Sequence, residues 1–213
     1  MHTEVYSELV KVYVDDLGER TKIYNAFKTN PAVKKKIDWM KKWMNRDTAT
    51  FAERAIAFAA IEGLFFSGSF AIIFWLKSKN LLPGLAQANE FISRDEGMHT
   101  KFTCLLYSMI ENKPDRETVN KIIDDAVDVE IEFQKEVLAK PNLGLNINTM
   151  SKYIKFVADF LLEELGYSRV YKTGNPFPFM QNLATHDKTN FFERQNTAYQ
   201  SGNNTGFKLV KDF

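Results

Sequence analysis

The sequence is poor in cysteine and in net charge, and these two shortages exclude several classes of protein. Cys104 is the single cysteine among 213 residues, so no disulfide can form within the chain. Such cysteine usage fits a reducing, cytoplasmic compartment. The formal net charge of +1 offers no broad electrostatic surface for nucleic acid or for an anionic membrane. We therefore expect a cytoplasmic protein that binds neither.

The sequence also shows no sign of a targeting segment or of repeat architecture. Residues 1–16 contain no basic region followed by an apolar stretch, so we expect no signal peptide. No internal repeat or low-complexity segment is evident. With 45% hydrophobic and 26% charged residues, the chain suits one globular domain with a sizeable core and a tail.

One long apolar run stands out at residues 55–76, where Glu62 is the only charged residue. By length the run could span a bilayer, which takes about 20 apolar residues. Against this, its aromatic residues are not confined to its two ends, and the other helical segments are amphipathic. A helix at the centre of a soluble bundle is the second interpretation. That interpretation leaves Glu62 unexplained, because burying an unpaired charge is costly.

Metal binding is the third interpretation of Glu62. Glu96 and His99 lie three residues apart, which places both side chains on one face of a helix. Helical bundles build carboxylate-rich metal sites from such Glu-x-x-His pairs and from single glutamates on facing helices. On spacing alone, a histidine satisfied within the core explains His99 equally well.

Hydrophobic periodicity predicts helices along most of the chain. A capping box at Thr50 and Glu53 marks the start of the apolar helix. Gly63 and the small residues at 67–69 are poor helix formers, so they permit close helix approach or a local distortion. We expect helices at residues 1–16, 20–28, 32–43, 50–76 and 85–111, then one opened by Pro114 and Asp115, and one capped by Asn148 that ends near Tyr171.

Two groups of charged residues resemble binding sites but are expected to be solvated faces. The lysines at 34–42, apart from Lys36, fall on the helix face away from Trp39 and Trp43. An apolar stripe at helical spacing through Ile122 and Ala126 implies that most of the acidic residues at 124–132 face water. From residue 185 the chain is polar with spaced aromatic residues, which indicates a docking peptide or a frayed terminus.

Several contiguous motifs resemble one family. Glu62 opens EGLFFSGSF, and ISRDEGMH ends at His99; GYSRV begins at Gly166, NPF at Asn175 and KTNFFE at Lys188. Together they resemble the small subunit of class I ribonucleotide reductase, of the eukaryotic and viral type, from residue 2 to the C-terminus. The resemblance implies an all-α, ferritin-like helical bundle with a carboxylate-bridged di-iron centre, manganese being an alternative metal.

The resemblance also implies an activity. Members of this family use the metal centre and oxygen to oxidise a tyrosine to a stable radical, which passes to a large subunit that reduces ribonucleotides to deoxyribonucleotides. The chain is thus expected to act in ribonucleoside-diphosphate reductase, as a homodimer with the large subunit as its partner. The residues that match the family's metal ligands are His2, Glu62, Glu96 and His99.

Further positions match other parts of the family's site. Phe66, Phe70 and Ile92 match the apolar pocket around the radical. Asp95 matches an acid that orients the imidazole of His2 and lies on the radical-transfer route, and Tyr199 matches the tail tyrosine of that route. The residues expected to dock on the large subunit are Phe207, Leu209 and Phe213, although Lys208 and Lys211 depart from the usual tail.

The match leaves part of the family's site outside this chain. The glutamate three residues before His2, an aspartate ligand, the radical tyrosine and a tryptophan of the transfer route are all expected to be missing. We expect residues 1–184 to form an N-terminally incomplete bundle and residues 185–213 a docking tail. Three explanations are open: a separate N-terminal fragment completes the site, the sequence is part of a longer reading frame, or the chain is a non-catalytic module that binds the large subunit through its tail.

Overall fold

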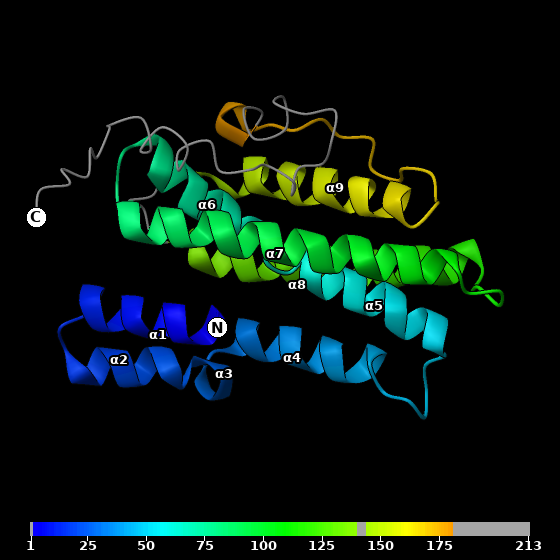
Figure 1. The fold of residues 1–213 in the computed structure, drawn as a ribbon, viewed down its shortest axis with the longest axis horizontal. Helices are drawn as coiled ribbons and strands as arrows, with labels where there is room; N and C mark the ends of the chain where they lie inside the picture. The colour runs from blue at the N-terminus through cyan, green and yellow to red at the C-terminus, as the bar shows by residue number, and fades with distance from the viewer. Residues whose placement is uncertain (1, 140–143, 181–213) are drawn as a thin grey trace, which may run out of the picture.

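The fold is known from a computed structural model that describes residues 2–139 and 144–180 (Figure 1). Helices account for most of these residues and no strand occurs among them, so the all-α prediction is confirmed. The helices are α1 (His2–Tyr13), α2 (Leu17–Tyr24), α3 (Ala26–Thr29), α4 (Pro31–Trp43), α5 (Phe51–Gly63), α6 (Ser67–Ser78), α7 (Pro83–Ser108), α8 (Arg116–Val137) and α9 (Ile147–Glu164).

The long helix α7 runs through the middle of the molecule (Figure 1). The contact between α5 and α7 is the most extensive between any two of the described helices, and α6 also lies along α7. Helix α8 packs against α4, α5 and α9, while α1 contacts α7. Residues from α5, α7, α8 and α9 therefore supply most of a single buried core, which includes Ile56, Ile122 and Leu162. Cys104 lies in this core and is 4% exposed, as expected for a small apolar residue.

Side-chain caps fix where several helices begin. Asn30, Thr50 and Asp115 each accept a hydrogen bond from a backbone N–H in the first turn, and Thr50 forms the predicted capping box with Glu53. The predicted cap at Asn148 is wrong. Asn146 takes that role, because its extended backbone lets its side chain accept from the Thr149 N–H at 2.9 Å.

Helix α9 also ends earlier than predicted, at Glu164 rather than near Tyr171. Gly166 adopts a φ of +88°, a left-handed conformation that suits glycine and stops the helix. Beyond it, the buried carboxylate of Asp159 accepts hydrogen bonds from the backbone N–H groups of Val170 and Tyr171, both at 2.8 Å. This carboxylate holds residues 170–173 against α9. Because the N–H groups of Val170 and Tyr171 bond to Asp159, they do not continue the helical hydrogen-bond pattern.

The predicted single helix at 50–76 is two helices, α5 and α6, separated by residues 64–66. At the break, the Phe65 N–H bonds the carbonyl of Ala60 at 3.1 Å, five residues back instead of four. The Ser67 hydroxyl donates to the Leu64 carbonyl at 2.7 Å. Such a side-chain hydrogen bond competes with the backbone hydrogen bonds of a regular helix. The poor helix formers in this stretch thus produce the local distortion that the sequence permitted.

By length and composition alone, the segment Phe51–Ser78 is apolar enough to cross a membrane. In the folded chain, however, 72% of its most apolar window is buried against other helices. A core helix of a globular bundle has this property, which accounts for the apolar run without a bilayer.

Candidate metal centre

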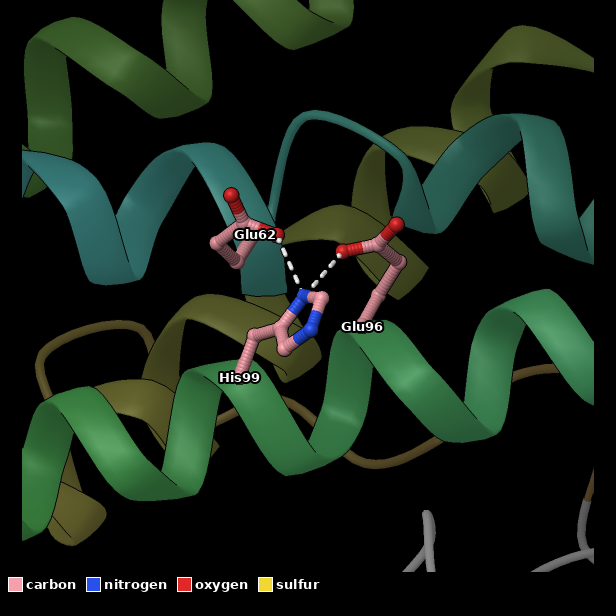
Figure 2. A group of neighbouring side chains, drawn as sticks. All are labelled: Glu62, Glu96 and His99. Carbon is pink, nitrogen blue, oxygen red and sulfur yellow. Dashed lines mark hydrogen bonds and ion pairs between the residues drawn. The ribbon is translucent and has the colours of Figure 1, made fainter. Parts of the chain in front are cut away.

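Three side chains from α5 and α7 converge on one point (Figure 2). Glu62 occupies the last turn of α5, and Glu96 and His99 lie one turn apart on α7. Each offers a carboxylate oxygen or an imidazole nitrogen, and these donor atoms all lie within 4.8 Å of one another. His99 Nδ1 is 3.0 Å from Glu96 Oε2 and 3.3 Å from Glu62 Oε2. The predicted pairing of a single glutamate with a Glu-x-x-His on a facing helix is therefore present in the geometry.

His2 reaches the same group from α1. Its Nδ1 lies 2.9 Å from Glu96 Oε1, so the two oxygens of Glu96 face two different histidines. Its other ring nitrogen, Nε2, lies 3.1 Å from Asp95 Oδ2. An acid in this position fixes the tautomer and the orientation of an imidazole. Glu96 is thus placed between His2 and His99 with one oxygen directed at each.

The two glutamates influence each other's protonation. Burial, followed by the neighbouring carboxylate of Glu96, raises the pKa of Glu62 to about 7. Burial acts to raise the pKa of Glu96 as well, but hydrogen bonds from Glu62 and His99 outweigh it and lower that pKa. Burial likewise opposes protonation of His99, yet its two carboxylate neighbours outweigh it and raise the pKa. The pair therefore retains a proton at a pH where a free glutamate has lost it.

A cavity of about 400 Å³ adjoins this group on the α1 side. Its apolar wall contains Phe66, Phe70 and Ile92, the three residues predicted to form the radical pocket. Tyr6, one helical turn after His2, lines the same cavity together with Glu96. Burial, and then the negative charge of Glu96, raise the pKa of the Tyr6 phenol, which keeps it protonated.

The family's radical tyrosine was expected to be missing from this chain, but the structure places a tyrosine at this site. Tyr6 lines the same cavity as the three apolar residues, and it is close enough to Glu96 for that charge to raise the pKa of its phenol. The spacing carried the signal, because residues four apart share a helix face, and Tyr6 follows His2 by four. In the segment HTEVYS, which begins at His2, only the histidine was assigned a role.

The remaining predicted residues differ in how far the structure describes them. Asp95 lies beside His2, and its part in radical transfer stays a prediction. The tail residues Tyr199, Phe207, Leu209 and Phe213, and the boundary between residues 184 and 185, lie outside the described residues. Acidic residues on α8 mostly face water as predicted, with the exception of Glu130, which is fully buried.

Comparison with known proteins identifies the family. The family model described as "Ribonucleotide reductase, small chain" matches residues 1–176. The chain is 51% identical to ribonucleoside-diphosphate reductase subunit M2 of Danio rerio over 94% of its own length and 52% of the relative's. It is 49% identical to the variola virus small chain over 100% of its length and 68% of that protein.

Solved structures show the same fold. The structure of the ribonucleotide reductase Rnr4 homodimer from Saccharomyces cerevisiae superposes with a TM-score of 0.78 at 37% identity, covering 93% of this chain and 60% of that one. The dimanganese(II)-NrdF of Streptococcus sanguinis, at 18% identity, agrees in fold with a TM-score of 0.67, over 85% of this chain and 65% of that one. The bundle is therefore ferritin-like, as predicted.

The chain spans a little more than half the length of the first curated relatives, 52% of one and 58% of another. The residues matched by the family model, 1–176, include the α5 and α7 segments that bring Glu62, Glu96 and His99 together. On these grounds the chain belongs to the family of ribonucleotide reductase small chains.

Proposed function

We propose that this chain supplies part of the metal centre of a class I ribonucleoside-diphosphate reductase, as its radical-generating small subunit. The observation that carries the proposal is the convergence of Glu62, Glu96 and His99, with His2 on the far side of Glu96. The centre is of the di-iron type, with manganese as the alternative metal. The proposed compartment is cytoplasmic, in keeping with the single, buried cysteine.

The donor set fits these metals. Carboxylate oxygens mixed with imidazole nitrogens are ligands that iron and manganese accept, and ionised carboxylates accept bonds without donating any. Glu62, Glu96 and His99 would hold one ion, and His2 with the second oxygen of Glu96 would contribute to another. When bound, such ions supply oxygen activation and one-electron oxidation.

The remaining residues of the site act around that chemistry. We propose Tyr6 as the residue that carries the radical. Of the two tyrosines that line the cavity, Tyr6 and Tyr24, it is the one that lies a helical turn after His2 and whose pKa the charge of Glu96 raises. Phe66, Phe70 and Ile92 exclude water and reductants from its ring. Asp95 holds the outer nitrogen of His2, so that Nδ1 stays directed at the centre.

The second metal position has too few ligands among these residues. Bundles of this type draw a single glutamate from each of two helices and a Glu-x-x-His pair from each of two others. Here Glu62 is one single glutamate, Glu96 and His99 are one pair, and His2 is half of the other pair. We propose that an N-terminal segment outside these residues contributes the remaining carboxylates, either as a complementing fragment or as part of the same longer chain.

The proposed partners follow the same family. We propose a homodimer, the assembly named for the yeast relative, and docking of residues 185–213 on the large subunit. Residues 1–184 would then form the metal-binding domain. The exposed apolar surface of the described helices gives the N-terminal fragment a place to bind.

Metal titration tests the proposed centre. Manganese(II) is added to the purified 213-residue chain, and free ion is followed by its paramagnetic resonance signal. We expect saturable binding that Glu62→Gln weakens by at least about 100-fold, since even the loss of an outer partner costs up to that much. Glu132→Gln, a change at an exposed residue paired with Lys35, serves as the control and leaves binding unchanged.

The alternative outcome is equally informative. If the wild-type chain and Glu62→Gln bind manganese equally weakly even with the complementing N-terminal fragment present, the chain is a non-catalytic module, and its tail becomes the functional part. For the radical, the chain is loaded with ferrous iron together with its complementing fragment and exposed to oxygen. Tyr6→Phe should then bind iron normally but lack the tyrosyl signal, and a retained signal would reject the assignment.

A further inference from the structure

The interruption between α5 and α6 lies directly beside the proposed metal centre. Glu62 is two residues before the break, Phe66 is its last residue, and Phe70 follows in α6. A broken helix leaves backbone groups without their usual partners, so other groups must hold the chain in place. Whatever fixes residues 64–66 therefore also fixes the direction from which Glu62 enters the site.

Two charged residues from other helices hold the break. Lys36 of α4 donates from Nζ to the carbonyl of Phe65 at 2.7 Å. The same Nζ lies 2.5 Å from Glu130 Oε2 of α8. On the other side of the break, the backbone N–H of Gly68 donates to the Glu130 carboxylate. One ion pair thus satisfies a carbonyl at the break and an N–H just beyond it.

The surroundings of this pair leave it little freedom. Gln134 donates from Nε2 to Glu130 Oε1 at 2.9 Å, and the ring of Phe133 lies 3.9 Å from Lys36 Nζ. A Cβ atom at Gly68 would approach Gln134 Nε2 to 2.5 Å, so glycine is required for α6 to lie this close to α8. The contacts define one arrangement of residues 64–68 against α4 and α8.

Stability alone does not account for this arrangement. The Glu130 side chain is fully buried and that of Lys36 is 14% exposed. Burial lowers the pKa of Lys36 and raises that of Glu130, although each partner opposes the shift of the other. Removing two charges from water costs free energy that an ion pair often fails to recover, and apolar replacements are often as stable. A role in fixing one geometry fits the pair better than a role in general stability.

We propose that Lys36 and Glu130 are positioning residues, which hold the break between α5 and α6 so that Glu62 stays directed at Glu96 and His99. They touch neither the donor atoms nor the cavity. They act through the backbone of residues 64–68. This inference rests on the proposed metal-binding function, and it assigns to the break the task of setting ligand geometry.

The test removes both charges together, because a single change would leave an unpaired charge in the core. In Lys36→Met/Glu130→Gln the glutamine keeps one oxygen that can accept from Gly68 or Gln134, whereas the Phe65 carbonyl loses its donor. Lys35→Met/Glu132→Gln is the matched control, since that exposed pair joins the same two helices. Asp159→Asn is a second control, which weakens a buried cluster away from the break.

The first measurement is hydrogen exchange of the metal-free chain. We expect amides in residues 61–70 to exchange about tenfold faster or more in Lys36→Met/Glu130→Gln, because a buried carbonyl has lost its partner. The exposed-pair control should match the wild type, and Asp159→Asn should speed exchange only in residues 159–173. Unchanged exchange at 61–70 overturns the inference, whether or not the chain binds metal.

The second measurement is manganese(II) affinity, with Glu62→Gln as the ligand variant. We expect Lys36→Met/Glu130→Gln to bind about 10- to 100-fold more weakly than the wild type, while Asp159→Asn binds normally despite its lower thermal stability. Suppose that Lys36→Met/Glu130→Gln binds manganese(II) as tightly as the wild type, while Glu62→Gln loses affinity. That result overturns the positioning role and leaves the proposed function intact. Equal binding by wild type and Glu62→Gln rejects the proposed function instead, and exchange at 61–70 then decides whether the pair holds the break.

Discussion

Glu96 is the residue on which the site depends most. Its two carboxylate oxygens face different histidines, one on α1 and one on its own helix. A carboxylate in that position can bridge two cations, which a glutamate facing a single partner cannot do. The sequence predicted His2, Glu62, Glu96 and His99 because each belongs to a contiguous motif. Tyr6 was missed although it lies in the same segment, HTEVYS, as His2, because only the histidine of that segment was assigned a role.

The pair Lys36 and Glu130 shows a different limit of sequence analysis. Helical spacing set Lys36 apart from the neighbouring lysines that face water, but it did not predict which residue Lys36 would pair with. Ninety-four positions separate the two residues, and Glu130 looks in the sequence like one more member of a charged, solvated face. Their burial depends on how α4 and α8 pack, which local periodicity does not encode.

Gly68 offers a test at the scale of one residue. In Gly68→Ala the new methyl group meets the buried side chain of Gln134, and overpacking of this kind costs about 1–3 kcal/mol. The alanine recovers about 1 kcal/mol in helix propensity, so we expect a net loss of up to about 2 kcal/mol in the free energy of unfolding. Urea denaturation measures it.

Gly174→Ala is the control for that substitution. No atom lies within 4 Å of a Cβ at this position, so the new methyl group has open space. We expect at most a slight gain in stability, because the unfolded chain loses conformational freedom. Equal effects of the two substitutions would contradict the close contact between α6 and α8.

At the scale of helices, the sequence predicted existence better than boundaries. The apolar face of α8 and the capping box of α5 are where periodicity and local chemistry placed them. The break after Gly63 was permitted by its small residues, yet its place is set by partners from α4 and α8. The start of α9 moved from Asn148 to Asn146, since either asparagine could serve and the backbone decides between them.

The capping box of α5 can be tested as an element. Thr50→Ala removes the side-chain oxygen that accepts from the Glu53 N–H, leaving that donor at the helix start without its partner. We expect the free energy of unfolding to fall by about 1 kcal/mol, as for other N-cap threonines. Thr48→Ala, at an exposed position just before the helix, should change stability by less than about 0.5 kcal/mol. A loss of the same size in both variants would argue against the cap.

At the scale of the molecule, an apolar stripe on α7 lies open to solvent. Phe102 and Leu105 are 61% and 53% exposed, and they belong to one helix face. His99 lies at the edge of this face, so a partner that covers the stripe also approaches the metal centre. The other members of the α7 stripe are Phe91, Met98 and Met109.

The α7 stripe predicts self-association of the chain on its own, because exposed apolar patches of this kind normally find a partner. We expect Phe102→Lys/Leu105→Lys to reduce the apparent mass in light scattering while changing the free energy of unfolding by less than about 0.5 kcal/mol. Thr48→Lys/Asn112→Lys adds the same charge at exposed polar positions and should leave association unchanged. Association that both double variants reduce equally would be electrostatic instead of apolar.

Trp39 gives the break between α5 and α6 an optical consequence. Its indole is 5% exposed and meets the ring of Phe65 edge-on, with 4.9 Å between ring centroids. Indole fluorescence shifts to longer wavelength when water reaches the ring, so loosening of residues 64–66 would redden the emission of Trp39 before the rest of the bundle unfolds. The chain thus carries an intrinsic chromophore against the segment that joins its two central helices.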